Sequence, residues 1–272
     1  MVNIQVETYK QWRTQARELL YRQIPPEDVH WQVDQQSNLL FSEDDTDFLE
    51  LPIKQKTISI PKAFLELAKP VCHHRDNSRW GLLYSIAWRL VFEDKHLLNF
   101  DIDPQIAKAM SMRKSIGRDI HKMEAFVRFR KTPCASSPEK DYFIAWFEPE
   151  HYIVPLVVSF FTRRFSNMHW SILTPDRCLH WDTKQAWQTE GVTRPEGLHD
   201  ELEELWKAYY KNIFNPARLK LKAMQSEMPK KYWVNLPEAP LIGELTRQSM
   251  FRTEKMMTNT SSEINNRKLK LK

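Results

Sequence analysis

The sequence contains four short runs rich in aromatic and aliphatic residues, FVRFRKT (126–132), YFIAWFE (142–148), MHWSILT (168–174) and CLHWD (178–182). Polar or turn-forming residues bound each run. Such runs are typical of β-strands. VPLVVSFFTRRF (154–165) separates the second run from the third and predicts a helix bounded by Pro155. Pro175 and Asp176 predict a tight turn, so the last two runs should form a hairpin. The order strand-strand-helix-strand-strand predicts an antiparallel four-stranded sheet in an α+β fold, with helices packed on one face.

The rest of the chain predicts mainly helices, at 8–21, 61–71, 79–92, from Asp103-Pro104 to about 126, from about 200, and at about 238–256. The segment 79–92 is apolar nearly all round, so we expect a centrally buried helix, capped by Asp76 or Asn77. We expect residues 1–257 to form a single α+β domain and residues 258–272 to be a disordered basic tail.

The composition excludes several classes of protein. No run approaches 18 consecutive apolar residues, and the N-terminus has no signal-peptide core, so we expect no membrane partner and a cytoplasmic location. The three cysteines, Cys72, Cys134 and Cys178, lack the spacing of a disulfide framework or a zinc site. No glycine-rich phosphate loop is present, and we expect no cofactor and no metal.

The positive charge is concentrated in one segment. Residues 113–131 contain seven basic residues against Asp119 and Glu124, an excess that equals the net charge of +5 of the whole chain. Such a concentration favours a polyanionic partner, and the alternative is a solvated basic helix face. On a helix, Arg118, His121 and Lys122 share one side. Arg113 falls on the predicted apolar side, so we expect it to be buried and paired with an acidic residue.

The sequence offers further candidate contacts with nucleic acid. Arg128 and Arg130 alternate on a predicted strand, where they could contact phosphates. Lys-Lys-Tyr-Trp at 230–233 interleaves cations with aromatic rings, as single-strand-binding surfaces do, although the same residues could form an anchored loop. The complete set of candidate nucleic-acid-binding residues is Arg113, Lys114, Arg118, Lys122, Arg128, Arg130, Arg163, Arg164, Arg218, Lys230, Lys231, Tyr232 and Trp233.

Several clusters could instead support catalysis. A general base could lie in His74-Arg75-Asp76 beside Arg79, although Asp76 could simply cap a helix. Glu148 and Glu150 could hold Mg²⁺, and the histidines and aspartate of the hairpin could bind metal or transfer protons, although surface acids and core histidines are the more common interpretations. The candidate catalytic residues are His74, Asp76, His121, Lys122, Glu148, His180 and Asp182.

Six strings carry a resemblance to a known family: HRDNSRWGLLYSIAWRL, RDIHKMEAFVRFR, AWFEPEHYIV, FFTRRFSNMHWSILTPD, YYKNIFNPARLK and MPKKYWVNLPEA. Together they resemble an uncharacterised bacterial family of probable DNA-metabolism or DNA-repair proteins, over residues 1 to about 257. In other members the domain is fused to a uracil-DNA-glycosylase-like domain, or is encoded beside a radical-SAM protein. The resemblance implies a role in DNA repair and implies no particular reaction.

Three hypotheses about function follow from these observations. In the first, the chain is a DNA-binding protein that presents damaged or single-stranded DNA to a partner enzyme, with a radical-SAM protein as the candidate partner; alone, it should bind DNA without turning it over. In the second, it is a DNA-processing enzyme, either a metal-dependent phosphodiesterase using Glu148 or Asp182 or a lyase with Lys122 as nucleophile. In the third, it is an interaction protein that binds no nucleic acid.

Overall fold

The computed structural model describes residues 1–32, 46–55, 57–132, 141–194 and 229–236. The chain forms two compact units, each of which has its own core. Unit 1 consists of residues 1–121 and 149–159, and unit 2 of residues 122–148 and 160–272. The helices predicted from about 200 and at 238–256, and the tail at 258–272, lie outside the described residues. No helix in the described ranges has both the length and the apolar character that a membrane span requires.

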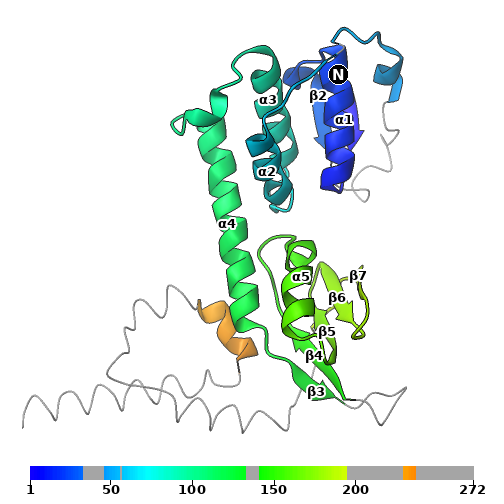
Figure 1. Cartoon of the computed structure of the whole chain (residues 1–272), viewed down its shortest axis with the longest axis vertical. Helices are drawn as coiled ribbons and strands as arrows, with labels where there is room; N and C mark the ends of the chain where they lie inside the picture. The colour runs from blue at the N-terminus through cyan, green and yellow to red at the C-terminus, as the bar shows by residue number, and fades with distance from the viewer. Residues whose placement is uncertain (33–45, 56, 133–140, 195–228, 237–272) are drawn as a thin grey trace, which may run out of the picture. The chain divides into compact units, whose positions relative to one another are not determined.

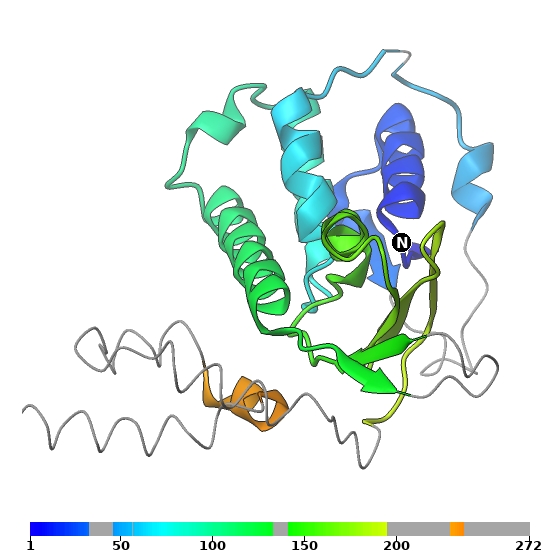
Figure 2. The same cartoon turned by 60° about the horizontal axis from the view of Figure 1, so that its bottom comes forward.

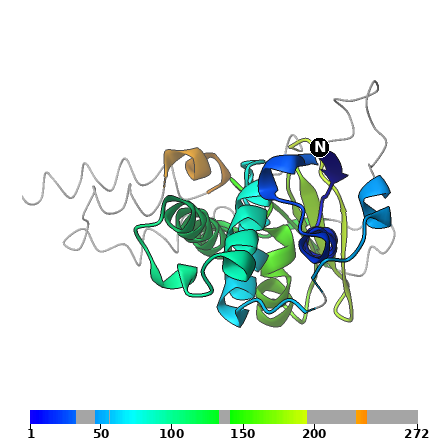
Figure 3. The same cartoon turned by 90° about the horizontal axis from the view of Figure 1, so that it is seen from above.

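Unit 1 is built mainly from helices that lie side by side (Figure 1). Its elements are β1 (Val2–Gln5), α1 (Tyr9–Arg22), η1 (Pro26–Asp28), β2 (Val29–Gln32), η2 (Thr46–Glu50), α2 (Lys62–Val71), α3 (Arg79–Phe92), η3 (Leu97–Asn99) and the larger part of α4 (Pro104–Phe126). The strands β1 and β2 pair in parallel as a separate two-stranded sheet, which the sequence patterns did not predict. Figure 3 shows α1 end-on beside this sheet.

The helix α3 lies at the centre of unit 1, which confirms the prediction of a buried helix. Trp80 at its start is fully buried, and its ring stacks on that of Trp12 of α1, with 6.4 Å between centroids. The indole Nε1 of Trp12 also donates to the carbonyl oxygen of Trp80 at 3.2 Å. The cap differs from the prediction, because Ser78 is the N-cap residue and Asp76 accepts a hydrogen bond from the backbone N–H of Ser78 at 2.8 Å.

The helix α4 begins and ends where the sequence predicted. The carboxylate of Asp103 accepts hydrogen bonds from the backbone N–H groups of Gln105 and Ile106, which have no partner within the helix. Arg89 of α3 forms an ion pair with the same carboxylate at 2.8 Å. The hydrogen bond from Arg89, assisted by those from Ile106 and Gln105, lowers the pKa of Asp103 from its ordinary value.

Replacing Asp103 by alanine is expected to lower the free energy of unfolding by about 1–2 kcal/mol, because the helix loses its cap and Arg89 its carboxylate. The folded pKa lies below the unfolded one, so this stabilisation is complete above the ordinary pKa of an aspartate, about 3.9, and disappears as the pH falls through the folded value. Urea unfolding at pH 6 and pH 3 measures both effects. Asp101→Ala, at an exposed residue two positions earlier, is the control. Equal losses for the two variants at pH 6 would contradict the assignment of the cap.

Unit 2 contains a five-stranded sheet in the order β3-β4-β5-β6-β7. Its strands are β3 (Arg130–Thr132), β4 (Tyr142–Trp146), β5 (His169–Leu173), β6 (Arg177–Trp181) and β7 (Ala186–Glu190). The predicted α+β class is confirmed, and so is the hairpin of β5 and β6. The predicted antiparallel four-stranded sheet is wrong, because the sheet has a fifth strand and β4 pairs with β5 in parallel. A connection through a helix, here α5 (Val154–Arg164), allows neighbouring strands to run in the same direction.

The part of α5 that belongs to unit 2 covers one face of this sheet (Figures 1 and 2). Phe161 of α5 packs on Trp170 of β5, with 6.1 Å between the ring centroids, and Phe129 packs on both rings. Ile172 and Leu179 on the same face are fully buried. The segment 126–129 does not join the sheet as predicted, since Phe126 is still helical and β3 begins only at Arg130.

Candidate nucleic-acid interface

The exposed side of α4 in unit 1 carries a cluster of cations. We call Arg113, Lys114, Arg118 and His121 the α4 basic face; all four are exposed. On a helix of about 100° per residue these positions fall within one arc of about 140°. Gly117 lies within that arc, and a Cβ atom built there would have no neighbour within 4 Å. The face therefore offers a patch of bare backbone surrounded by basic side chains.

The opposite side of α4 explains why this positive charge is not neutralised locally. Ala109, Met112 and Ile116 are buried there, and so is Asp119, which accepts a hydrogen bond from the backbone N–H of His151 at 2.9 Å. Asp119 is the only acidic residue within Arg113–His121, and its carboxylate points into the protein. The α4 basic face has no exposed carboxylate along this stretch of helix.

The prediction that Arg113 is buried and paired is wrong, because the residue is exposed. Nearby on α4, Met110 is 44% exposed, whereas Met112 is buried at 4%. Arg113 lies within about 20° of buried Ile106 around the helix, seven residues later, so the side of α4 that is covered at Ile106 is open at Arg113. This correction adds one cation to the exposed face.

The remaining cations of the basic segment belong to unit 2 and already have protein partners. Lys122 lies 5.7 Å above the ring of Tyr232, and Arg128 donates to the carbonyl oxygen of Ala125 at 2.7 Å. Lys131 forms an ion pair with Asp141 at 2.7 Å, and Arg130 is half-buried in β3. A phosphate would have to compete with these partners, so unit 2 contributes less free positive charge than its sequence indicated.

The other predicted nucleic-acid contacts are scattered over unit 2. Arg163 and Arg164 are exposed at the end of α5. Tyr232, in η5 (Lys230–Asn235), is buried and stacks on Phe147 with 5.1 Å between centroids, and Lys231 lies 4.8 Å above its ring. Trp233 is half-buried. Arg218 and the side chain of Lys230 lie outside the described residues. The Lys-Lys-Tyr-Trp segment thus anchors itself to the core through Tyr232.

A second polar cluster joins three distant segments of unit 1. The ring of His74 packs on that of His151, with 4.2 Å between centroids and 30° between planes. Nε2 of His151 lies 2.7 Å from Oγ of Ser115 on α4. The carbonyl oxygen of Tyr152 lies 2.9 Å from Nδ1 of His73, and the backbone N–H of Tyr152 donates to the carbonyl oxygen of His73. The cluster ties residues 72–79 and 149–153 to α4.

The hydrogen bonds of this cluster argue against a catalytic triad, although it contains Ser115, His151 and Asp119. The backbone N–H of Arg75 donates to Nδ1 of His151 over 3.4 Å, so the proton of the neutral ring belongs on Nε2 and points at Ser115. In that tautomer His151 cannot accept the serine proton, as a general base must. Asp119 accepts a hydrogen bond from the backbone N–H of His151. The arrangement fits a structural anchor.

The candidate base His74 is also engaged in local structure. Its Nδ1 accepts from the backbone N–H of Asp76 at 3.1 Å. Burial lowers the pKa of His74, and the nearby Arg79 and Lys108 lower it further, whereas Asp76 raises it. Arg79, which follows the His74-Arg75-Asp76 run, is buried and donates to the carbonyl oxygen of Cys72 at 2.9 Å. Asp76 has a lowered pKa, chiefly because it accepts the hydrogen bond from Ser78. These contacts favour a local structural role for His74, Asp76 and Arg79.

The hairpin brings His180 together with Ser171, its direct neighbour across β5 and β6. Nδ1 of His180 lies 2.5 Å from Oγ of Ser171, which lies 2.6 Å from the hydroxyl of Tyr142. Nε2 of His180 lies 2.9 Å from Oγ1 of Thr189. Four side chains from four strands thus form one hydrogen-bonded chain. Asp182 is not part of it, since it accepts from the backbone N–H groups of Lys184 and Gln185.

The contact at the Thr189 end of this chain indicates which atom donates in each of its hydrogen bonds. The hydroxyl of Thr189 lies 3.4 Å from the carbonyl oxygen of Glu190, a long contact that favours donation from the Nε2–H of His180 to Thr189. Nδ1 of the neutral ring then accepts from Ser171, and Ser171 accepts from Tyr142. Burial lowers the pKa of His180, which agrees with a neutral ring. The chain fixes the ring of His180 at both nitrogen atoms.

The carboxylates proposed as magnesium ligands lie apart from any cluster of metal-binding groups. Glu148 is exposed and accepts from Nε1 of Trp146 at 2.8 Å. In the part of the chain that the structure describes, no three side chains of His, Cys, Asp or Glu are grouped closely enough to hold a metal ion. His121, another catalytic candidate, is exposed on the α4 basic face.

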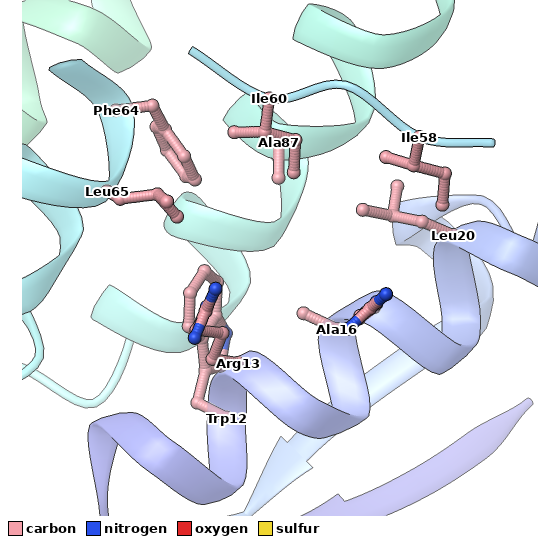
Figure 4. Close-up of a pocket in the computed structure, with 10 residues that line it drawn as sticks. Trp12, Arg13, Ala16, Leu20, Ile58, Ile60, Phe64, Leu65 and Ala87 are labelled. Atoms are coloured by element: carbon pink, nitrogen blue, oxygen red, sulfur yellow. The ribbon is translucent and has the colours of Figure 1, made fainter. Parts of the chain in front are cut away.

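Unit 1 also contains an apolar cavity of about 280 Å³ that the sequence patterns did not predict. Figure 4 shows its walls, which come from α1, α2, α3 and the segment 58–60. Phe64, Ile58 and Leu20 supply apolar surface, and Arg13 and Arg17 supply positive charge. In the described part of the chain, no ion pair involves either arginine.

One comparison with known proteins gives a match. The model of DUF4130, a domain of unknown function, matches residues 77–238, which is more than half of the 272 residues. The matched segment includes the α4 basic face, Ser115, His151 and the five-stranded sheet. No curated protein and no solved structure matches the chain.

Proposed function

This chain belongs to the family defined by DUF4130, a domain of unknown function, and from its residues we propose that it is a DNA-binding protein of DNA repair or metabolism. The observation that carries the proposal is the α4 basic face, with Arg113, Lys114, Arg118 and His121 exposed together. Exposed Arg and Lys side chains in such an array can contact the phosphates of a nucleic-acid backbone. The bare backbone at Gly117 lets a phosphate approach the helix closely.

The number of exposed cations on the α4 basic face predicts a modest affinity for DNA that falls as the salt concentration rises. The three permanent cations of the α4 basic face could neutralise about three phosphates, which would give a slope of log K against log salt of about −2 to −3. That slope is typical of binding without sequence selection. A protein with this property suits a role in which DNA is held for a separate enzyme, and we propose a radical-SAM protein as the candidate partner.

Charge reversal on the α4 basic face tests the proposal. Arg113→Glu/Arg118→Glu should weaken binding of a fluorescently labelled 20-nucleotide DNA by about tenfold or more at 50 mM KCl, and should reduce the salt slope by about 2. Fluorescence anisotropy at several salt concentrations measures both quantities, with single-stranded and duplex DNA.

The control must change the net charge equally at another place. Lys10→Glu/Lys95→Glu reverses two exposed cations of unit 1 outside α4, and it should bind DNA within about twofold of the wild type if location matters. Equal weakening in both double variants would reduce the proposal to a non-specific charge effect and overturn it. Absence of binding by the wild type at 50 mM KCl would overturn it as well.

A further inference from the structure

The sheet of unit 2 has a second face, opposite the one that α5 covers. One residue from each strand lies in a single cross-strand row on this face: Arg130, Ile144, Ser171, His180 and Trp187. Interiors of sheet faces are normally apolar, so a polar row through the centre, with Ser171 only 4% exposed, needs an explanation. The hydrogen-bonded chain through Tyr142, Ser171, His180 and Thr189 supplies one, and it fixes the side chains of this face.

The end of this row is an aromatic platform. Trp187 of β7 is 43% exposed, and its ring stacks on the imidazole of His180, with 5.4 Å between centroids and 22° between planes. The imidazole cannot rotate, because Ser171 and Thr189 hold its two nitrogen atoms. An indole supported by a fixed ring is already ordered before a ligand arrives, which reduces the entropy lost on binding.

The rest of this face carries further rings. Tyr142 and His169 are half-buried on the same face as Trp187 and His180. Among the strand residues that alternate onto this face in β3 to β7, none is Asp or Glu, and Asp182, just after β6, interacts electrostatically with His169. A ligand that carries planar groups is therefore favoured over a purely aliphatic one.

We propose that this sheet face binds the unpaired bases of single-stranded DNA, with Trp187 as the stacking platform. The inference rests on the proposed DNA binding and specifies the form of DNA. In a duplex the bases are stacked on one another and paired, so their flat faces cannot reach an indole on a sheet. In a single strand each base can stack on an aromatic side chain, whatever its sequence.

Replacement of Trp187 separates this surface from the α4 basic face. Trp187→Ala is expected to weaken binding of a dT12 oligonucleotide about tenfold, the lower part of the range for loss of one stacked base, and to leave binding of a 12-base-pair duplex within about twofold. Trp187→Phe, which keeps a ring, should restore most of the affinity for dT12. Phe100→Ala removes an equally exposed aromatic side chain from unit 1 and should change neither affinity.

Each outcome of these anisotropy titrations has a definite meaning. Unchanged binding of dT12 by Trp187→Ala, or equal losses for dT12 and the duplex, overturns the stacking platform while the proposed DNA binding stands. A wild type that binds neither DNA overturns both proposals. Tighter binding of the matching U12 RNA than of dT12 overturns the assignment to DNA. If Trp187→Ala fails to fold by circular dichroism, Trp187→Leu keeps the apolar bulk, lacks a ring and should show the same selective loss.

Discussion

Replacing Trp80 by alanine is expected to lower the free energy of unfolding by about 3–5 kcal/mol, the range found for the removal of large buried aromatic side chains. Trp80 is fully buried at the start of α3, where its ring stacks on Trp12. The ring of Trp12 cannot move into the empty space, because its Nε1 donates a hydrogen bond to the backbone carbonyl oxygen of residue 80. Guanidinium unfolding followed by circular dichroism measures the loss.

Trp88, on the same helix, provides the matched control. It is half-buried and packs on Phe92, so Trp88→Ala removes the same atoms from a site with part of its surface already in water. We expect a loss clearly smaller than that of Trp80→Ala. Similar losses for the two variants would show that α3 is not buried with Trp80 at the centre of the core. If Trp80→Ala is too unstable to purify, Trp80→Phe keeps a ring and should lie between the wild type and the alanine variant.

Replacing Gly191 by alanine is expected to destabilise unit 2 by about 3 kcal/mol or more, because the new methyl group has no space. A Cβ atom at Gly191 would lie 1.9 Å from the carbonyl oxygen of Pro175, in the turn between β5 and β6. The atoms that the new methyl group would meet belong to the backbone of Pro175 and Asp176, which cannot rotate away as a side chain can. The hydrogen bond from the N–H of Val192 to the carbonyl oxygen of Thr174 holds the two segments together at this point.

The same substitution at Gly117 gives the opposite expectation. Gly117 is exposed in the middle of α4, where a Cβ atom would touch nothing within 4 Å, and alanine favours a helix over glycine by about 1 kcal/mol. Thermal unfolding should therefore show a lower Tm for Gly191→Ala and an unchanged or higher one for Gly117→Ala. A Gly191→Ala protein as stable as the wild type would show that the end of β7 does not approach the turn so closely.

Elements with a strong local pattern were predictable from the sequence. The helices α1, α3 and α4 have long periodic runs with recognisable first residues, and the hairpin has a proline turn between two aromatic strands. Pairing over long distances was not predictable. The strands β1 and β2 have only four residues each, and β7 (AWQTE) is largely polar because half of it faces outward. The direction of β5 relative to β4 depends on how α5 packs, which no local pattern records.

In the candidate site, too, some features were predictable from local sequence and others were not. A count of charges located the α4 basic face, because Arg113, Lys114 and Arg118 are close in sequence. It could not decide on which side Arg113 points, since Met110 and Met112 serve equally well as members of an apolar stripe. The sequence also did not predict that Trp187 is exposed, because tryptophan is usually assigned to cores. Its ring is held by His180, and this contact arises from the pairing of β6 with β7, which no local pattern predicts.

The interruption of unit 1 by part of unit 2 affects how the chain can fold during its synthesis. Asp119 and Ser115 leave the ribosome well before His151, which binds both of them. At about 5–20 residues per second, the nascent N-terminal segment waits a few seconds for residues 149–159, the piece that completes its contacts. During this interval the side of α4 that later holds His151, where Met112, Ile116 and Asp119 become buried, is open to water and to chaperones. A fragment that stops at residue 121 would remain in that state permanently, so the first 121 residues should not be treated as an independent domain when the gene is truncated.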